Sequence, residues 1–205
     1  MNFNHRQLEH WMELIRTHPD GIECFWPSQI RAKSWIVDTL EFNTRIPQPF
    51  SCIIFGGWYG VLADMLRIED VCIVDLEEKH LEWCSKKYTT WGGCMSEYTY
   101  LHDPDLVINT VTEHISQRVY DKWFDNIPEG THYIIQGNND FKDEDHIRAT
   151  VDLDTFAVKN KLTNYIMLEE QSYEGPWDFE NGKPNYLKRF MGIGKKENGK
   201  ESERK

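Results

Sequence analysis

Three glycines and one acid are the residues whose types and spacing first suggest chemistry. Gly56, Gly57 and Gly60 follow one short apolar run, and Asp75 ends the next. A glycine-rich turn between a strand and a helix aims backbone N–H groups at a bound anionic or polar ligand. An acid about 20 residues further on, at the tip of the second strand, can bind the hydroxyls of a ribose. The alternative is a tight strand-to-helix turn that binds no ligand.

Two further polar segments could act on a substrate. Glu113 and His114 are adjacent, and imidazole titrates near neutral pH, so this pair could remove a proton. The alternative is that Glu113 caps the following helix and that His114 bonds a backbone carbonyl. Gln136, Asn138 and Asn139 could bind a substrate through their amides, or they could simply form a turn.

The segment from Asp140 to His146 contains four acids and one histidine. Carboxylates and imidazole are metal ligands, so a metal site is one interpretation. The other is the solvated first turn of a helix, where the helix dipole favours acids. We favour the second interpretation, and the sequence therefore predicts no metal site.

The elements that position these residues alternate between strands and helices. Helical spacing predicts helices that start near Val61 and Glu77, and residues 153–155 are typical of a helix cap. Short apolar runs predict strands at 52–55, 71–74, 105–110, 133–135, 164–168 and 187–193, the last two around a turn-rich insert at 175–184. This pattern predicts a three-layer α/β sandwich with a mostly parallel sheet and a late hairpin.

The third strand is ambiguous. A weak candidate near Tyr98 would leave only a few residues before the strand at 105–110, whereas a parallel crossover needs a dozen or more. Either the third strand lies earlier and is short, or the usual intervening helix is missing.

The first 45 residues predict a helical extension. A helix from Phe3 to Ile15 is expected to bury Leu8, Trp11, Met12 and Ile15. A second helix starts at Ser28, with an apolar stripe of Ile30, Trp35, Ile36, Leu40 and Phe42. Trp26 lies in the aromatic loop between the two helices, where it could pack in the core or line a ligand pocket. We therefore divide the chain into an extension (1–45), a core domain (46–195) and a disordered charged tail (196–205).

Composition narrows the possible partners. The 205 residues carry a formal net charge of -11, which disfavours nucleic acid because binding to phosphates relies on Lys and Arg. The five cysteines show no CxxC spacing, so neither a disulfide framework nor a zinc site is expected. Without a signal peptide or a membrane-spanning apolar run, the expected location is the cytoplasm.

The order of these segments resembles the class I S-adenosylmethionine-dependent methyltransferases over residues 50–195. FGGWYG is similar to that family's glycine-rich first motif, and VCIVDLE to its acid after the second strand. DLVINTVTEHI resembles the fourth-strand motif, and IPEGTHYIIQGNND the turn and fifth strand. NYIMLEEQSYEG and YLKRFMGIGKK resemble the terminal hairpin, whose last strand is antiparallel in this Rossmann-like fold. The glycine loop also resembles uncharacterised methyltransferase-like proteins of bacteriophages.

The resemblance implies a cofactor, S-adenosylmethionine, and a methyl acceptor that we expect to be a small molecule. On the residue types and positions given above, we expect Glu113 and His114 to act on the acceptor and Trp26, Gln136, Asn138 and Asn139 to bind it. The resemblance implies cofactor contacts from Gly56, Gly57, Trp58, Tyr59, Gly60, Asp75, Leu76, Asn109 and Thr110.

The chain also departs from the family pattern. Ile54 and Trp58 stand where the family has an acid and a further glycine. Alternatives are a non-catalytic nucleotide- or S-adenosylmethionine-binding module, another enzyme that consumes the same donor, and a dinucleotide-dependent enzyme.

Overall fold

The computed structural model describes residues 5–178 and 183–197. Its strands are β1 (Ser51–Phe55), β2 (Asp70–Asp75), β3 (Thr89–Gly92), β4 (Leu106–Asn109), β5 (His132–Asn138), β6 (Tyr165–Asp178) and β7 (Lys183–Lys195). They form one sheet in the order β3-β2-β1-β4-β5-β7-β6. The first five strands are parallel, and β7 runs antiparallel to both β5 and β6. The predicted mostly parallel sheet with a C-terminal antiparallel hairpin is confirmed.

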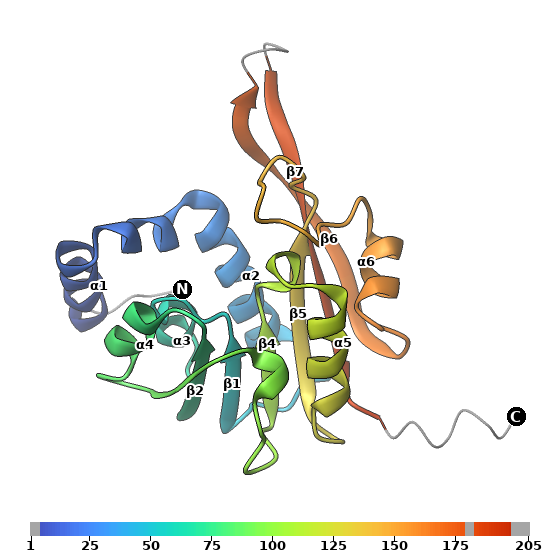
Figure 1. Cartoon of the computed structure of the whole chain (residues 1–205), viewed down its shortest axis with the longest axis horizontal. Coiled ribbons are helices and arrows are strands. Elements are labelled where there is room, and N and C mark those ends of the chain that lie inside the picture. Colours follow the sequence, from blue (N-terminus) through green and yellow to red (C-terminus); the bar gives the residue numbers. More distant parts are fainter. Residues whose placement is uncertain (1–4, 179–182, 198–205) are drawn as a thin grey trace, which may run out of the picture.

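Helices cover both faces of the sheet (Figure 1). The α-helices are α1 (His5–Thr17), α2 (Pro27–Phe42), α3 (Val61–Met65), α4 (Glu78–Cys84), α5 (Gln117–Asn126) and α6 (Leu153–Lys159). Three 3₁₀ helices are η1 (Pro19–Phe25), η2 (Met95–Glu97) and η3 (Thr112–His114). One apolar core joins the sheet to α1, η1, α2, α3 and α4, and the other joins it to η2, α5 and α6. The predicted three-layer α/β sandwich is therefore confirmed.

β1 shows how its sequence produces the two cores. Successive side chains of a strand point to opposite faces. Cys52 and Ile54 lie in the first core, and Ile53 and Phe55 lie in the second. A strand that is buried on both faces must be apolar at nearly every position. This is why the run at 52–55 identifies the central strand of the sheet.

The ambiguous third strand is the four-residue β3, which pairs with β2 from Thr89 to Gly92. It lies earlier than the weak candidate near Tyr98, and that residue instead follows η2. The crossover from β3 to β4 contains η2 in place of a full α-helix. Both explanations offered for the short spacing are therefore correct. The strand is early and short, and a short 3₁₀ helix replaces the usual connecting α-helix.

The face of α1 that is buried differs from the predicted one. Trp11 and Leu14 are the buried residues of this helix, whereas Leu8 and Met12 are 47% and 71% exposed. The reason is that α1 packs against both η1 and α3 through Trp11. Its indole N–H donates to the Asp64 carboxylate over 2.8 Å, and its ring lies 5.3 Å from that of Phe25. In α2, the predicted stripe holds except at Phe42, which is 74% exposed at the last turn.

Three predictions for the second half need correction. The acids after Asp140 do not begin a helix, because residues 141–151 are turns and bends and α6 starts at Leu153, capped by Asp152. The hairpin strands extend through most of the predicted insert at 175–184, of which 179–182 lie outside the described residues. Lys196 is bonded through its backbone to Gly130 and Thr131, so the predicted disordered tail does not begin there, and 198–205 lie outside the described residues. Over the described ranges, none of the helices combines the length and the apolar character that crossing a membrane requires.

Candidate functional site

The polar residues singled out in the sequence come together at the carboxyl ends of the parallel strands. β1 runs beside both β2 and β4, and β4 runs beside β5. The segments that follow these strands therefore meet at one edge of the sheet, at the point where the strand order reverses. Ligands of open α/β sheets bind at this position.

The turn after β1 is shaped by its glycines. Gly56 and Gly60 have φ angles of 69° and 75°, a left-handed conformation that glycine adopts without strain. A Cβ on Gly56 would lie 2.2 Å from Cγ1 of Val111, so this glycine also lets the β1 turn and the β4 loop touch. Trp58 has a φ of 51° in the same turn, at the position where the resembling family has a further glycine.

Asp75 faces this turn from the tip of β2. Its Oδ2 accepts a hydrogen bond from the Trp58 backbone N–H over 2.9 Å, and its Oδ1 accepts from the Glu77 N–H over 3.1 Å. Burial alone would raise the pKa of Asp75, but hydrogen bonds from His80, Glu77 and Trp58 outweigh it and lower the pKa. The carboxylate therefore stays ionised at neutral pH.

His80 belongs to the candidate site by its contacts, and the sequence did not reveal it. Its Nδ1 lies 3.2 Å from Oδ1 of Asp75, and its ring packs edge-on against Tyr59 with the centroids 4.5 Å apart. It lies on α4, five residues after the acid. Tyr59 itself is 1% exposed and donates its hydroxyl to Asp20 of η1, so its hydroxyl is directed at the N-terminal helices.

Glu113 is held beneath the tips of β4 and β5. It is 4% exposed, and its Oε1 accepts a hydrogen bond from Nδ2 of Asn138 over 2.5 Å. The cap of α5 is Ser116, whose hydroxyl accepts from the Val119 N–H, so Glu113 does not cap that helix. Burying a carboxyl group is costly, so its position at the carboxyl edge makes Glu113 a candidate functional group.

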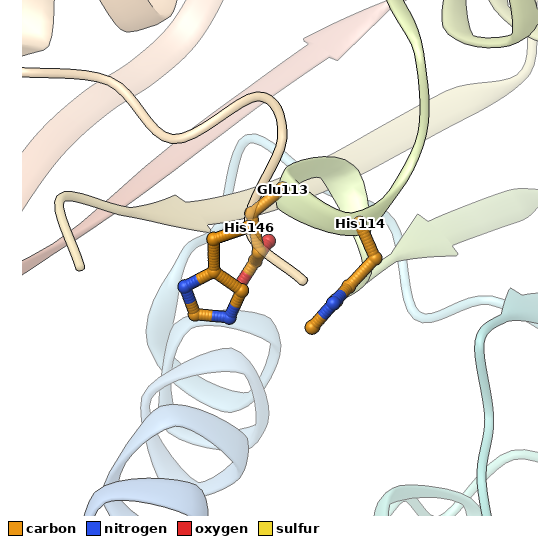
Figure 2. A group of neighbouring side chains, drawn as sticks. All are labelled: Glu113, His114 and His146. Carbon is orange, nitrogen blue, oxygen red and sulfur yellow. The ribbon is translucent and has the colours of Figure 1, made fainter. Parts of the chain in front are cut away.

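His146 joins Glu113 and His114 from a loop 32 residues further along the chain. The rings of His114 and His146 are 4.6 Å apart and nearly perpendicular. Figure 2 shows the three side chains converging, two from η3 and one from the loop between β5 and α6. One potential metal-binding atom from each lies within 4.8 Å of the others, so these residues could hold a metal ion.

Two buried cations lie next to this edge. Lys33 on α2 is 9% exposed, and its Nζ lies 5.8 Å from the centre of the Trp58 ring. Burial lowers its pKa to about 8, which keeps it mostly charged at neutral pH. Arg189 on β7 pairs with Asn138 in the sheet, and its buried Nε has no hydrogen-bond partner among the described residues. Neither cation has a carboxylate within ion-pair distance over the described ranges.

Most of the amides predicted to bind ligands are bonded inside the protein. Asn109 is fully buried and accepts the Val111 N–H. Gln136 donates to the Ala32 carbonyl of α2, and Asn139 accepts the Lys188 N–H of β7. Thr110 donates to the Gly56 carbonyl. These groups hold the β1 turn, α2 and β7 in place around the edge.

Trp26 and Leu76 remain on the surface, 52% and 70% exposed. Two hollows, of about 300 Å³ and about 290 Å³, lie at the opposite, amino-terminal edge of the sheet, near Asp105 and Asp70. We assign the candidate site to the carboxyl edge, because the buried charges described above gather there.

Comparisons with known proteins concern the fold. No family model matches the sequence, and no curated protein matches it. Among solved structures, YcgJ from Bacillus subtilis aligns with a TM-score of 0.61 at 13% identity, over 82% of this chain and 99% of that one. NodS from Bradyrhizobium japonicum, an N-methyltransferase in complex with S-adenosylhomocysteine, aligns with a TM-score of 0.60 at 11% identity, over 89% and 98%.

TehB from Haemophilus influenzae aligns with a TM-score of 0.58 at 12% identity, over 80% of this chain. The chain spans 62% of TehB, less than two thirds of its length. At these identities the likeness concerns the fold, which is that of the class I S-adenosylmethionine-dependent methyltransferases.

Proposed function

We propose that this chain is an S-adenosylmethionine-dependent methyltransferase that acts on a small, anionic acceptor. The observation that carries the proposal is the position of Asp75. Its ionised carboxylate faces the glycine turn at the carboxyl edge of a methyltransferase-type sheet. An acceptor of hydrogen bonds beside a close-approach turn is what a nucleoside needs.

The residues present fit the nucleoside of this cofactor. A carboxylate offers roughly four lone-pair positions, and three neighbours occupy Asp75 here: Trp58, Glu77 and His80. The remaining position has no hydrogen-bond donor among the described residues and could accept a ribose hydroxyl, and rotation of His80 would free a second. Leu76, exposed beside the acid, is suited to one face of the adenine.

The chemistry needs little from the protein beyond positioning. S-adenosylmethionine supplies a methyl group on a sulfonium whose positive charge already activates it. When the acceptor lone pair forms the new bond to carbon, the carbon–sulfur electron pair returns to sulfur, and the acceptor loses a proton. Val111 packs against Gly56, and this contact brings the following residues Glu113 and His114 close to the β1 turn. They are therefore the groups in place to accept the acceptor's proton.

Lys33 and Arg189 support an anionic acceptor. Buried cations are costly unless they are paired. A carboxylate or phosphate on the acceptor would supply the missing partner at the moment of binding. This also explains why a protein with a net charge of -11 keeps two positive groups at this edge.

A second candidate function is a binding module that holds the nucleoside without turnover. It is favoured by Trp58, which occupies a left-handed position in the turn and bonds directly to the acid. In this case the ligand would bind and no product would form.

Turnover assays test the proposal. Purified protein is incubated with S-adenosylmethionine carrying a labelled methyl group and with pools of small carboxylates, phosphates, amines and neutral alcohols. We expect S-adenosylhomocysteine to form with an anionic pool, and Lys33→Met to raise the KM for that acceptor by about 10-fold or more. The matched control is Lys122→Met, on the exposed side of α5. Ligand binding without product in every pool would support the binding module instead.

A further inference from the structure

The cluster of Glu113, His114 and His146 has the composition of a metal site. Two imidazoles and one carboxylate present their ligand atoms within 4.8 Å of one another. A single ion bound at roughly 2.0–2.2 Å from each donor would bring such atoms to about 3–4 Å apart, so small side-chain movements suffice. Figure 2 shows that the three side chains point toward a common space.

Glu113 is a buried carboxyl group that has no positively charged partner within ion-pair distance among the described residues. It receives the Asn138 amide and lies 3.4 Å from the Thr112 hydroxyl, and both of these donors are neutral. Over the described ranges, no Lys, Arg or His lies within ion-pair distance of its carboxylate. Arg148 interacts electrostatically with Glu113, but its guanidinium is bonded to Gln117, Asn160 and two backbone carbonyls. A bound cation would supply the partner that this buried carboxyl group lacks.

His146 is already oriented as a ligand. Its Nδ1 lies 2.8 Å from the backbone carbonyl of Asp140, and a proton on Nδ1 leaves the lone pair on Nε2. A carbonyl that accepts the second ring N–H is the usual support of a metal-binding histidine. The carboxylate of Asp143 lies 3.5 Å from Nε2, close enough to become a fourth ligand.

The loop that carries His146 is fixed to the rest of the site. The Arg148 backbone N–H donates to the Glu113 carbonyl over 2.9 Å, and the Thr150 N–H donates to the Asn138 carbonyl over 3.0 Å. The Arg148 side chain is 5% exposed and stacks on the Tyr120 ring at 4.0 Å. The approach of His146 to Glu113 is therefore built into the packing of the loop.

We propose that Glu113, His114 and His146 bind one divalent transition-metal ion of the Mn²⁺, Fe²⁺, Co²⁺ or Zn²⁺ type. Two imidazole nitrogens favour these ions over Mg²⁺ and Ca²⁺, which prefer oxygen ligands. His114 is exposed, so the site is open on one side and leaves a position for another ligand. Binding of the ion does not depend on the proposed function. The role of the ion does rest on it: with the ion bound, Glu113 and His114 would act on the acceptor's proton through the metal and not as free bases. An acceptor oxygen or amine at the open position would be acidified and would release its proton to solvent.

Binding measurements without S-adenosylmethionine test the site. The full chain, stripped with a chelator, is titrated with Co²⁺, Mn²⁺, Zn²⁺ and Mg²⁺ by calorimetry, and the Co²⁺ complex is followed by its visible absorption. We expect about one transition-metal ion per chain and much weaker Mg²⁺ binding. Glu113→Gln, His114→Ala and His146→Ala should each weaken Co²⁺ binding by about 100-fold or more, since even the loss of supporting residues costs 10- to 100-fold.

The control is His102→Ala, an exposed histidine after η2 that should leave Co²⁺ binding unchanged. Circular dichroism confirms that each variant is folded. Should a variant unfold, broadening of the His114 and His146 ring signals by Mn²⁺ in the unchanged protein gives the same answer. Absence of binding at millimolar Co²⁺, or binding that all three substitutions leave intact, would overturn the proposal. Loss of metal binding with intact S-adenosylhomocysteine binding, or the reverse, separates failure of the site from failure of the proposed function.

Discussion

The Asp75 carboxylate accepts a hydrogen bond from the Trp58 backbone N–H over 2.9 Å, which joins the tip of β2 directly to the turn after β1. The two sides of the proposed nucleoside site are therefore in contact, with His80 completing the set of donors around the acid. A ribose that enters must share or replace these donors. We infer that ligand binding shifts Trp58 and His80, whereas Gly56 stays fixed against Val111.

The contact of Gly56 with Val111 can be tested with a matched pair of glycines. Gly56 and Gly130 have φ angles of 69° and 84°, but a Cβ on Gly130 would meet nothing within 4 Å. Gly130→Ala should cost about 1–2 kcal/mol of unfolding free energy, from backbone strain alone. Gly56→Ala should cost roughly 2–5 kcal/mol, because overpacking against Val111 is added. Chemical denaturation measures both, and equal costs would contradict the close contact.

The burial of Lys33 predicts a pH-dependent stability. Burial lowers its pKa in the folded protein from the ordinary value of 10.5 to about 8. Below pH 8 the lysine is charged in both states, so the full cost of burying this charge lowers the unfolding free energy. Between pH 8 and 10.5 the unfolded chain binds more protons at this residue, so stability rises with pH. Lys33→Met should therefore raise the unfolding free energy at pH 7 by on the order of 3 kcal/mol. Above pH 10.5, where Lys33 is neutral in both states, this gain should disappear.

The measurement is the difference in unfolding free energy between Lys33→Met and the unchanged protein, taken at pH 7 and at the highest pH that preserves the fold. Lys122→Met, on the exposed side of α5, is the control and should show no trend with pH. A gain for Lys33→Met that does not shrink as the pH rises would show that the Lys33 charge is not buried at a cost.

Arg148 is expected to hold the loop after β5 in place. Its guanidinium donates to Gln117, Asn160 and the carbonyls of Thr112 and Lys159. Arg148→Met should lower the unfolding free energy by roughly 3 kcal/mol or more, because several buried acceptors lose their donor. Arg148→Lys keeps the charge but loses the planar fork, so an intermediate loss is expected. If Arg148→Met were as stable as the unchanged protein, the loop would not depend on this anchor.

The sequence predicted the parts of the fold that follow from local apolar patterns. The runs at 52–55 and 71–74 are buried strands, because central strands covered on both faces must be apolar throughout. β3 escaped prediction because Thr89 to Gly92 form a short edge strand with half-exposed side chains. The buried face of α1 was misplaced because it is set by long-range contacts, among them those of Trp11 with Asp64 and with Phe25.

Candidate site residues could be predicted from the sequence when they lie directly after a strand, but contacts between distant segments could not. Asp75 was found from its distance to the glycine turn. The approach of His146 to Glu113 depends on a turn-rich loop held by Arg148, and no spacing in the sequence reports that contact. Gln136 and Asn139 were predicted to face a substrate, and their bonds to α2 and β7 became visible only with the packing of these elements.

The most direct test of the central claim is a calorimetric titration of the folded protein with S-adenosylhomocysteine and with NAD. Asp75→Ala and Asp70→Ala are compared, since these acids stand at opposite ends of β2. We predict binding of S-adenosylhomocysteine but not NAD, weakened roughly 10- to 100-fold by Asp75→Ala and unchanged by Asp70→Ala. Binding of NAD alone, or S-adenosylhomocysteine binding that a folded Asp75→Ala variant retains in full, would contradict the account.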